Sequence, residues 1–171
     1  MTVSDDQGRE HRFGLPPVVG NDPTILFLGT IPSVQSSRKG QYYGNPFNHF
    51  WRLMAEVLEE KMPEDYRGRC EMLTRNGIVI WDVLAECDIR GSGDHSITNP
   101  VPNDVAGFLD LNNNIRHIFI NGKTAHRFYL EFHEGAFDGE VTVLPSSSPA
   151  NAMRWADRLG KWLEIRKALR S

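Results

Sequence analysis

Short, mostly apolar runs alternate with amphipathic segments along this chain. Four such runs predict strands, at residues 24–28, 78–81, 117–121 and 140–144. Apolar side chains at helical spacing predict helices at residues 48–60, 67–75, 105–111, 123–132 and 150–169. Strands that alternate with helices predict an α/β fold, here a three-layer α/β/α sandwich around a central four-stranded, mainly parallel sheet.

Two stretches fall outside this alternation. Residues 1–12 are polar and charged, so we expect residues 1–20 to form a partly disordered N-terminal tail ahead of a single domain at residues 21–171. Residues 86–104 include the polar sequence GSGDHSITNPVPND and predict a long loop, with Asn103 as the cap of the next helix. The 171 residues suffice to bury one hydrophobic core.

The composition favours a cytoplasmic protein that contacts no membrane. The apolar runs are too short to cross a bilayer, and residues 1–12 lack the apolar segment of a signal peptide. Cys70 and Cys87 form no CxxC pair, so we interpret both as reduced core residues. The formal net charge of −3 means that a nucleic-acid partner requires positive charge concentrated on one face.

Three polar loops follow predicted parallel strands, whose carboxyl ends meet at one edge of the sheet. They are GTIPS at 29–33, NGKT at 121–124 and LPSSSPANA at 144–152. The second loop is not a P-loop, because His117 stands where that motif requires glycine, so it predicts a turn at Gly122. The serines of the third loop lack the GxSxG elbow of a hydrolase; they suit either phosphate contacts or a plain turn with a helix cap.

No cofactor or metal site is expected. The six histidines show no HExxH or other close ligand spacing.

Residues 40–54, GQYYGNPFNHFWRLM, hold the densest set of aromatic and amide side chains. Tyr42 and Tyr43 are able to stack on a planar base, and Phe50 with Trp51 to line a wall. Asn48 is suited to cap the following helix or to hydrogen-bond a ligand. Ordinary core packing explains the tyrosines as well, but the combination favours a pocket for a flat, hydrogen-bonding ligand.

Six segments in order resemble the uracil-DNA glycosylase superfamily, above all its hypoxanthine-DNA glycosylase branch, family 6, which is related to mismatch-specific uracil and thymine glycosylases. The segments that carry the resemblance are residues 29–33 (GTIPS), 41–51 (QYYGNPFNHFW), 81–84 (WDVL), 98–104 (TNPVPND), 119–124 (FINGKT) and 144–151 (LPSSSPAN). The resemblance implies that Asn48, in the segment ending NxFW, is catalytic. Two positions depart from the family pattern: Phe47, where a basic residue is expected, and Ile31, where mismatch-specific relatives place a catalytic asparagine.

The resemblance also implies the remaining site residues. The base pocket is expected to include Gly29, Thr30, Ile31, Pro32, Ser33, Tyr43 and Phe50. The DNA-binding residues are expected to be Ser146, Ser147, Ser148, Pro149, Ala150, Asn151, Lys123 and Arg154. Lys123 and Arg154 are included for their charge rather than from the resemblance, and Arg158, Lys161 and Arg127 are further candidates for phosphate contacts. A solvated helix face explains all five of these charges equally well.

The expected function is that of a monofunctional DNA glycosylase in base excision repair. It hydrolyses the N-glycosidic bond of a flipped deaminated base, hypoxanthine or uracil, in double-stranded DNA and acts as a monomer. Asn48 either positions water or stabilises the departing base, and no lysine stands out as a Schiff-base nucleophile. A damaged-DNA binding module without catalysis and a free nucleoside hydrolase remain the alternatives.

Overall fold

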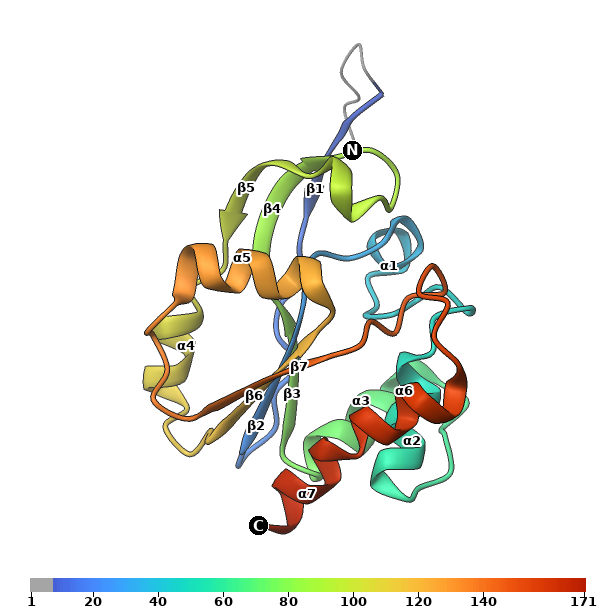
Figure 1. The fold of residues 1–171 in the computed structure, drawn as a ribbon, viewed down its shortest axis with the longest axis vertical. Helices are drawn as coiled ribbons and strands as arrows, with labels where there is room; N and C mark the ends of the chain where they lie inside the picture. The colour runs from blue at the N-terminus through green and yellow to red at the C-terminus, as the bar shows by residue number, and fades with distance from the viewer. Residues whose placement is uncertain (1–7) are drawn as a thin grey trace.

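Four parallel strands form the centre of the protein. The computed structural model describes residues 8–171, and its central sheet has the order β3-β2-β6-β7 (Figure 1). The strands are β2 (Ile25–Gly29), β3 (Ile78–Asp82), β6 (His117–Asn121) and β7 (Glu140–Leu144), within one residue of their predicted bounds. Each neighbouring pair is parallel, which confirms the predicted sheet.

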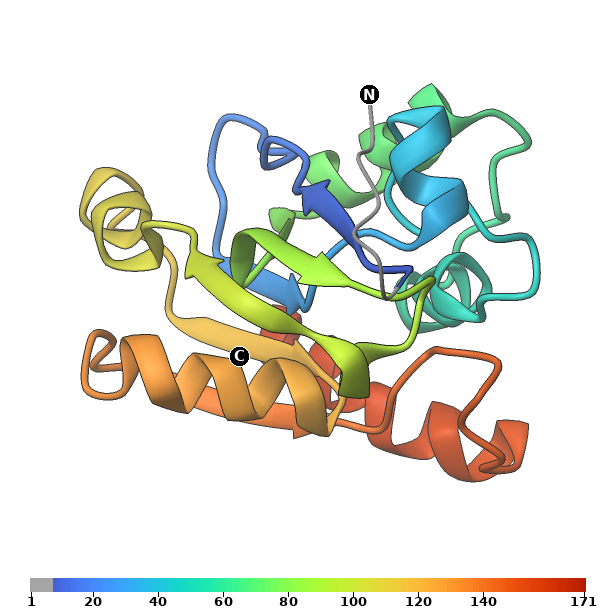
Figure 2. The same cartoon turned by 90° about the horizontal axis from the view of Figure 1, so that it is seen from above.

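Helices cover both faces of this sheet, as the predicted three-layer sandwich requires. Alternate side chains of β2 decide the layers: Ile25 and Phe27 pack toward one face, and Leu26 and Leu28 toward the other. The first face is covered by α2 (Phe50–Leu58), α3 (Tyr66–Arg75), α6 (Trp155–Trp162) and α7 (Glu164–Arg170). The second is covered by α4 (Val105–Leu111) and α5 (Lys123–His133), on the other side of the sheet in Figures 1 and 2.

A second sheet corrects the predicted tail and the predicted polar loop. Strands β1 (Glu10–Phe13), β4 (Leu84–Ile89) and β5 (Thr98–Pro102) pair antiparallel in the order β1-β4-β5, with the short 3-10 helix η1 (Asp94–Ser96) before β5. The expectation of a tail over residues 1–20 is therefore wrong for β1, and residues 1–7 lie outside the described part of the chain. These strands look polar in sequence because only one face of β4 is buried.

The structure adds one short helix and corrects two smaller predictions. A short helix, α1 (Val34–Lys39), follows the first polar loop, and the side chain of Ser33 caps it. Asp104 rather than Asn103 caps α4, while Asn103 donates to the carbonyl oxygen of Asp82 at 2.8 Å. The predicted C-terminal helix is two helices that meet at Leu163.

Candidate functional site

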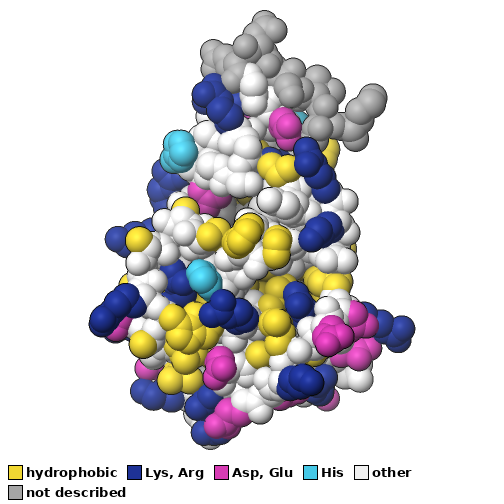
Figure 3. All heavy atoms as spheres, turned by 90° about the vertical axis from the view of Figure 1, so that its right-hand side faces the viewer, with side chains coloured by type: hydrophobic (Ala, Val, Ile, Leu, Met, Phe, Trp, Pro, Cys, Tyr) yellow, Lys and Arg dark blue, Asp and Glu magenta, His cyan; other side chains and the backbone are white. Residues whose placement is uncertain are grey.

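The segments that follow the four parallel strands surround a cavity of about 310 Å³. The chain after β2 and the chain after β7 both extend to the right in Figure 1, toward the face that Figure 3 presents. The cavity is lined by these predicted site residues: Gly29, Thr30, Ile31, Pro32, Ser33, Tyr43, Asn48, Ser146, Ser147, Ser148, Pro149 and Ala150. Phe50, Asn151, Lys123 and Arg154 are not among its lining residues.

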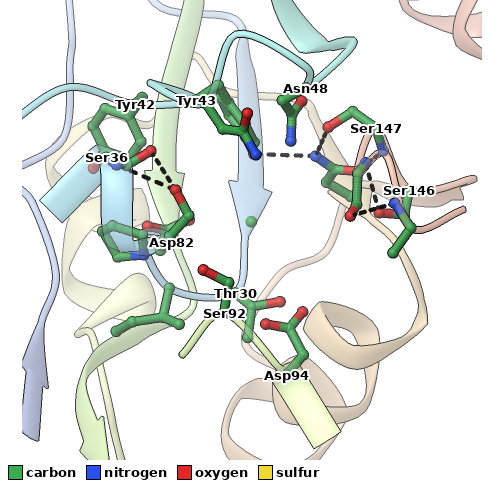
Figure 4. A pocket seen from close by; sticks show the side chains of 18 of the residues that line it. Thr30, Ser36, Tyr42, Tyr43, Asn48, Asp82, Ser92, Asp94, Ser146 and Ser147 are labelled. Carbon is green, nitrogen blue, oxygen red and sulfur yellow. Dashed lines mark hydrogen bonds between the residues drawn. The ribbon is translucent and has the colours of Figure 1, made fainter. Parts of the chain in front are cut away.

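Asn48 ends a tight turn and reaches the cavity (Figure 4). Its backbone N–H donates to the carbonyl oxygen of Asn45 at 3.0 Å, and its side-chain Oδ1 accepts the N–H of Phe50 at 2.9 Å. A carboxamide nitrogen does not accept hydrogen bonds, so this contact decides which end of the side chain faces the backbone. The N-cap residue of α2 is His49, and Asn48, one residue earlier, accepts the first N–H of the helix while presenting the two N–H donors of Nδ2 to a ligand.

Asn121, at the end of β6, holds two sides of the cavity together. Its Nδ2 donates to the hydroxyl of Tyr43 at 3.1 Å and to Oγ of Ser147 at 2.9 Å, and its Oδ1 accepts the N–H of Ser147 at 2.9 Å. The sequence around Asn121 predicts only a strand-to-helix turn. Its place at the carboxyl end of a buried strand was the available signal.

Three of the four aromatic candidates, Tyr42, Tyr43 and Phe50, have different environments. Tyr43 lines the cavity, and its ring stacks on Phe50 with centroids 4.0 Å apart and an interplanar angle of 18°. Phe50 is fully buried beneath that ring, so it supports the wall without forming it. Tyr42 is also buried, and its hydroxyl lies 3.0 Å and 2.9 Å from the carbonyl oxygens of Leu15 and Pro16. Tyr43 alone of the three therefore remains suited to stack on a ligand.

Two carboxyl groups that the sequence analysis did not single out also line the cavity. Asp82, at the end of β3, is 4% exposed, and its Oδ2 has no hydrogen-bond partner among the described residues. Burial, together with the charge of Asp94, raises the pKa of Asp82 to about 7. Burial also raises the pKa of Asp94, against the lowering effect of its contacts with Thr30 and Arg12. A neutral Asp82 side chain offers a hydrogen-bond donor as well as an acceptor at physiological pH.

Arg12 brings the N-terminal strand into the site. It is 2% exposed and lines the cavity, and its Nη1 donates to the carbonyl oxygen of Pro32 at 3.3 Å. The segment predicted to be a tail therefore stabilises the loop at residues 29–33 through this hydrogen bond.

The comparisons with known proteins match nearly the whole chain. The model of the uracil DNA glycosylase superfamily matches residues 16–170. The chain belongs to this superfamily. Its general activity is therefore that of a DNA glycosylase.

Two curated relatives and one solved structure are similar to this glycosylase. A hypoxanthine DNA glycosylase of Methanosarcina barkeri is 36% identical over 155 residues, which cover 90% of this chain and 97% of that protein. A hypoxanthine DNA glycosylase of Methanosarcina acetivorans is 36% identical over 150 residues, covering 87% of this chain and 94% of that protein. The solution NMR structure of a candidate uracil DNA glycosylase from Methanosarcina acetivorans superimposes with a TM-score of 0.83 at 35% identity, over 94% of this chain and 99% of that one.

Hydrogen bonds within the loop after β7, together with bonds from other segments, hold the loop in place. Ser147 is fully buried, and its Oγ accepts a hydrogen bond from Asn121. Its side chain therefore does not face a DNA backbone at the surface of the glycosylase. Oγ of Ser146 accepts the N–H of Ser148, and Oγ of Ser148 accepts the N–H of Ala150. The exposed residues of the loop are Pro149, Ala150 and Ala152.

Only some of the basic residues predicted to contact phosphates are exposed. Arg158 is 1% exposed, and its Nη2 donates to the carbonyl oxygen of Asn151 at 2.5 Å, so it supports the loop from inside. Arg154, Lys123, Lys161 and Arg127 are exposed, as a phosphate contact requires. Arg154 also forms an ion pair with Asp157.

No group of three His, Cys, Asp or Glu side chains within residues 8–171 is arranged to hold a metal ion. In the same range, no helix has the length and apolar character that a bilayer-crossing helix needs. The described residues that line the cavity include no lysine.

Proposed function

We propose that this protein is a monofunctional DNA glycosylase that hydrolyses the N-glycosidic bond of hypoxanthine, and of uracil as a second substrate, in double-stranded DNA. The base flips out of the helix into the cavity and leaves an abasic site. The protein acts as a monomer in the cytoplasm. One observation carries this proposal. Asn48, whose Nδ2 makes no hydrogen bond among the described residues, and the buried Asp82 both line the same cavity.

The cavity suits one neutral base. Ligand pockets commonly measure about 300–1,000 Å³, and 310 Å³ lies at the lower end of that range. The carboxyl group of Asp94, which also lines the cavity, disfavours a phosphate group there, because anions repel each other strongly where water is excluded. Phosphates therefore stay outside, and the base alone enters.

Asp82 has the hydrogen-bonding pattern that a deaminated base needs. Hypoxanthine and uracil each carry a ring N–H next to a carbonyl oxygen. A protonated carboxyl group accepts from that N–H through one oxygen and donates to that carbonyl through the other. The unpartnered Oδ2 of Asp82 is the atom available for this contact.

Asn48 stabilises the departing base. Cleavage leaves negative charge on the base, and N–H donors directed at it lower the barrier more than they stabilise the neutral substrate. Oδ1 of Asn48 is held by the N–H of Phe50, so Nδ2 is the group that donates. The absence of lysine from the described cavity lining supports hydrolysis by water, without a Schiff base and without strand cleavage.

Single-turnover assays test the proposal on duplexes that contain hypoxanthine, uracil, xanthine or an undamaged base. Wild type is expected to produce abasic sites, fastest with hypoxanthine, and to leave free inosine intact. Asn48→Asp keeps the acceptor for Phe50 and loses the donors, so its rate is expected to fall at least about 100-fold, a loss typical of one transition-state donor. Asn114→Ala is the matched control, because Asn114 is exposed and precedes β6 at the far end of the sheet.

The outcomes separate the alternatives. DNA binding without base release favours a binding module, and release of hypoxanthine from free inosine favours a nucleoside hydrolase. If Asn48→Asp cuts as fast as wild type, Asn48 does not act as a donor, and its role in positioning water takes precedence.

A further inference from the structure

Phe47 is the most exposed aromatic side chain of the described residues, and in the sequence it lies between Asn45 and Asn48, which both line the cavity. It is 76% exposed, while its neighbours Phe50 and Trp51 are 0% and 4% exposed. Leaving a phenylalanine in water forgoes the favourable free energy of its burial. The ring therefore contributes little to the stability of the free protein, and a bound molecule is able to recover that free energy.

The backbone around Phe47 is pre-arranged. Residues 45–48 form a turn closed by the Asn48 N–H to Asn45 carbonyl contact, with Pro46 restricting the second position. Oδ1 of Asn45 accepts the N–H of Phe47 at 3.0 Å, which holds the third position as well. The turn presents the ring of Phe47 to solvent and the side chain of Asn48 to the cavity. A ligand that covers Phe47 therefore lies directly beside the cavity mouth.

The turn is joined to the opposite rim of the mouth. The N–H of His49 donates to the carbonyl oxygen of Ser147 at 3.0 Å, so the two rims keep a constant separation. The opposite rim also carries exposed apolar groups: Pro149, Ala150 and Met153, which is 40% exposed.

Cationic side chains lie near the exposed apolar residues of the two rims. Nζ of Lys39 donates to the carbonyl oxygen of Gly44, just before the turn, and the guanidinium of Arg52 lies 4.4 Å from the ring centre of Trp155. On this side of the molecule, hydrophobic side chains lie among Lys and Arg side chains (Figure 3). Exposed apolar side chains suit contact with the base stack of a DNA duplex, and the cations beside them suit contact with its phosphates. An apolar protein partner would not need the cations.

We propose that Phe47 enters the base stack and occupies the space that the flipped nucleotide leaves, while Asn48 contacts the same nucleotide in the cavity. This inference rests on the proposed glycosylase function. Proteins that open or kink DNA insert apolar side chains between bases, and the new contacts compensate the free-energy cost of unstacking. A phenylalanine ring stacks on the neighbouring bases irrespective of their sequence.

The test compares Phe47→Ala and Phe47→Leu with wild type on two substrates of the same sequence. One holds hypoxanthine in a fully paired duplex, and the other holds it in an unpaired bubble, where no base needs to be displaced. Phe47→Ala is expected to lower the single-turnover rate at least about tenfold on the duplex and less than about twofold on the bubble. Phe47→Leu is expected to recover most of the duplex rate.

Phe13→Ala is the matched control. Phe13 is 61% exposed, lies on β1 and is not among the cavity-lining residues, so its removal is expected to change neither rate. Melting temperatures should stay within about 2 °C for all these variants, because surface substitutions have small effects on stability.

A fluorescence measurement decides the question without cleavage. A duplex with 2-aminopurine next to a 2′-fluoro-deoxyinosine, which resists hydrolysis, reports unstacking on binding. Wild type is expected to increase the fluorescence, and Phe47→Ala to leave it near the level of free DNA at saturating protein. If Phe47→Ala lowers both cleavage rates equally, or leaves the duplex rate and the fluorescence unchanged, the inference is wrong. If wild type cuts neither substrate, the proposed function fails instead.

Discussion

Gly29 and Asp82 are paired in register at the ends of the neighbouring strands β2 and β3. A Cβ at Gly29 would lie 2.5 Å from Oδ1 of Asp82 and 2.8 Å from the hydroxyl of Tyr43. The absence of a side chain at residue 29 therefore lets a carboxyl group and a phenol approach the same point of the cavity.

Gly29→Ala should disturb both neighbours. The added methyl group overlaps Asp82 and Tyr43, and overpacking of this kind costs about 1–3 kcal/mol. We expect base release to slow at least about tenfold, with a lower melting temperature. The control is Gly160→Ala on α6, where nothing lies within 4 Å of the added Cβ and a gain of about 0.5–1 kcal/mol is expected. Equal activity of wild type and Gly29→Ala would show that the geometry of Asp82 and Tyr43 is not critical.

The burial of Asp82 should make stability depend on pH. Its pKa is about 7 in the folded protein, against about 3.9 in an unfolded chain, so the folded state binds the proton more tightly. Its contribution to the unfolding free energy is full below about pH 4 and is lost as the pH rises through about 7. One pKa unit corresponds to about 1.4 kcal/mol, so the loss is on the order of a few kcal/mol.

Asp82→Asn removes this titration and should give a flatter stability curve between pH 5 and about 8 in denaturant unfolding. Asp94, which faces Asp82 and also has a raised pKa, remains and keeps part of the slope in the same direction. A slope as steep in Asp82→Asn as in wild type would assign the pH dependence to other groups.

Asp82→Asn should also change the pH profile of activity. Ionised Asp82 offers only acceptors, so the wild-type rate is expected to fall above about pH 7. Asparagine keeps one donor and one acceptor at every pH, so the variant should stay active and lose the alkaline decline. Single-turnover rates from pH 5 to about 9 measure both profiles. A profile that is identical in the two proteins contradicts a role for Asp82 in contacting the base.

The ring and the hydroxyl of Tyr43 should contribute differently to stability and to the rate of base release. Tyr43→Phe keeps the stack on Phe50 and loses the contact with Asn121, at a cost of about 0.5–1.5 kcal/mol in stability and a few-fold loss in rate. Tyr43→Ala removes the cavity wall, so a rate loss of at least about tenfold is expected. Equal effects of the two substitutions in single-turnover assays would place the importance of Tyr43 in its hydroxyl.

Substitutions of Arg158 and Arg154 should distinguish a structural role from a phosphate contact. Arg158→Ala leaves the carbonyl oxygen of Asn151 without its buried donor, so stability should fall by about 1–3 kcal/mol. Arg154→Ala should keep the melting temperature and, if Arg154 contacts a phosphate, reduce the slope of log affinity against log salt by about one. DNA binding measured between about 50 and 200 mM salt gives the slope. An unchanged slope in Arg154→Ala removes this residue from the DNA-binding surface.

Periodicity in the sequence predicts the central sheet almost to the residue, because strands buried on both faces are short, apolar and bounded by turn residues. The conformation of Gly122, with φ of +90°, likewise agrees with its prediction as a turn glycine. The antiparallel sheet could not be predicted in this way. Arg12 and the polar residues of β5 resemble tail and loop, because the strands that pair with them are distant in the chain, and Arg12 is buried only through such contacts.

The sequence by itself determined the α/β class, the parallel sheet and the set of loops at the ends of its strands, because local apolar patterning encodes which faces are buried. The tertiary structure alone decided which side chains of those loops meet. It placed Asp82, Asp94 and Arg12 on the cavity, and it buried Phe50, Ser147 and Arg158. It also oriented the carboxamide of Asn48. Burial and hydrogen-bond partners arise from contacts between distant segments, and no local pattern of residue types records them.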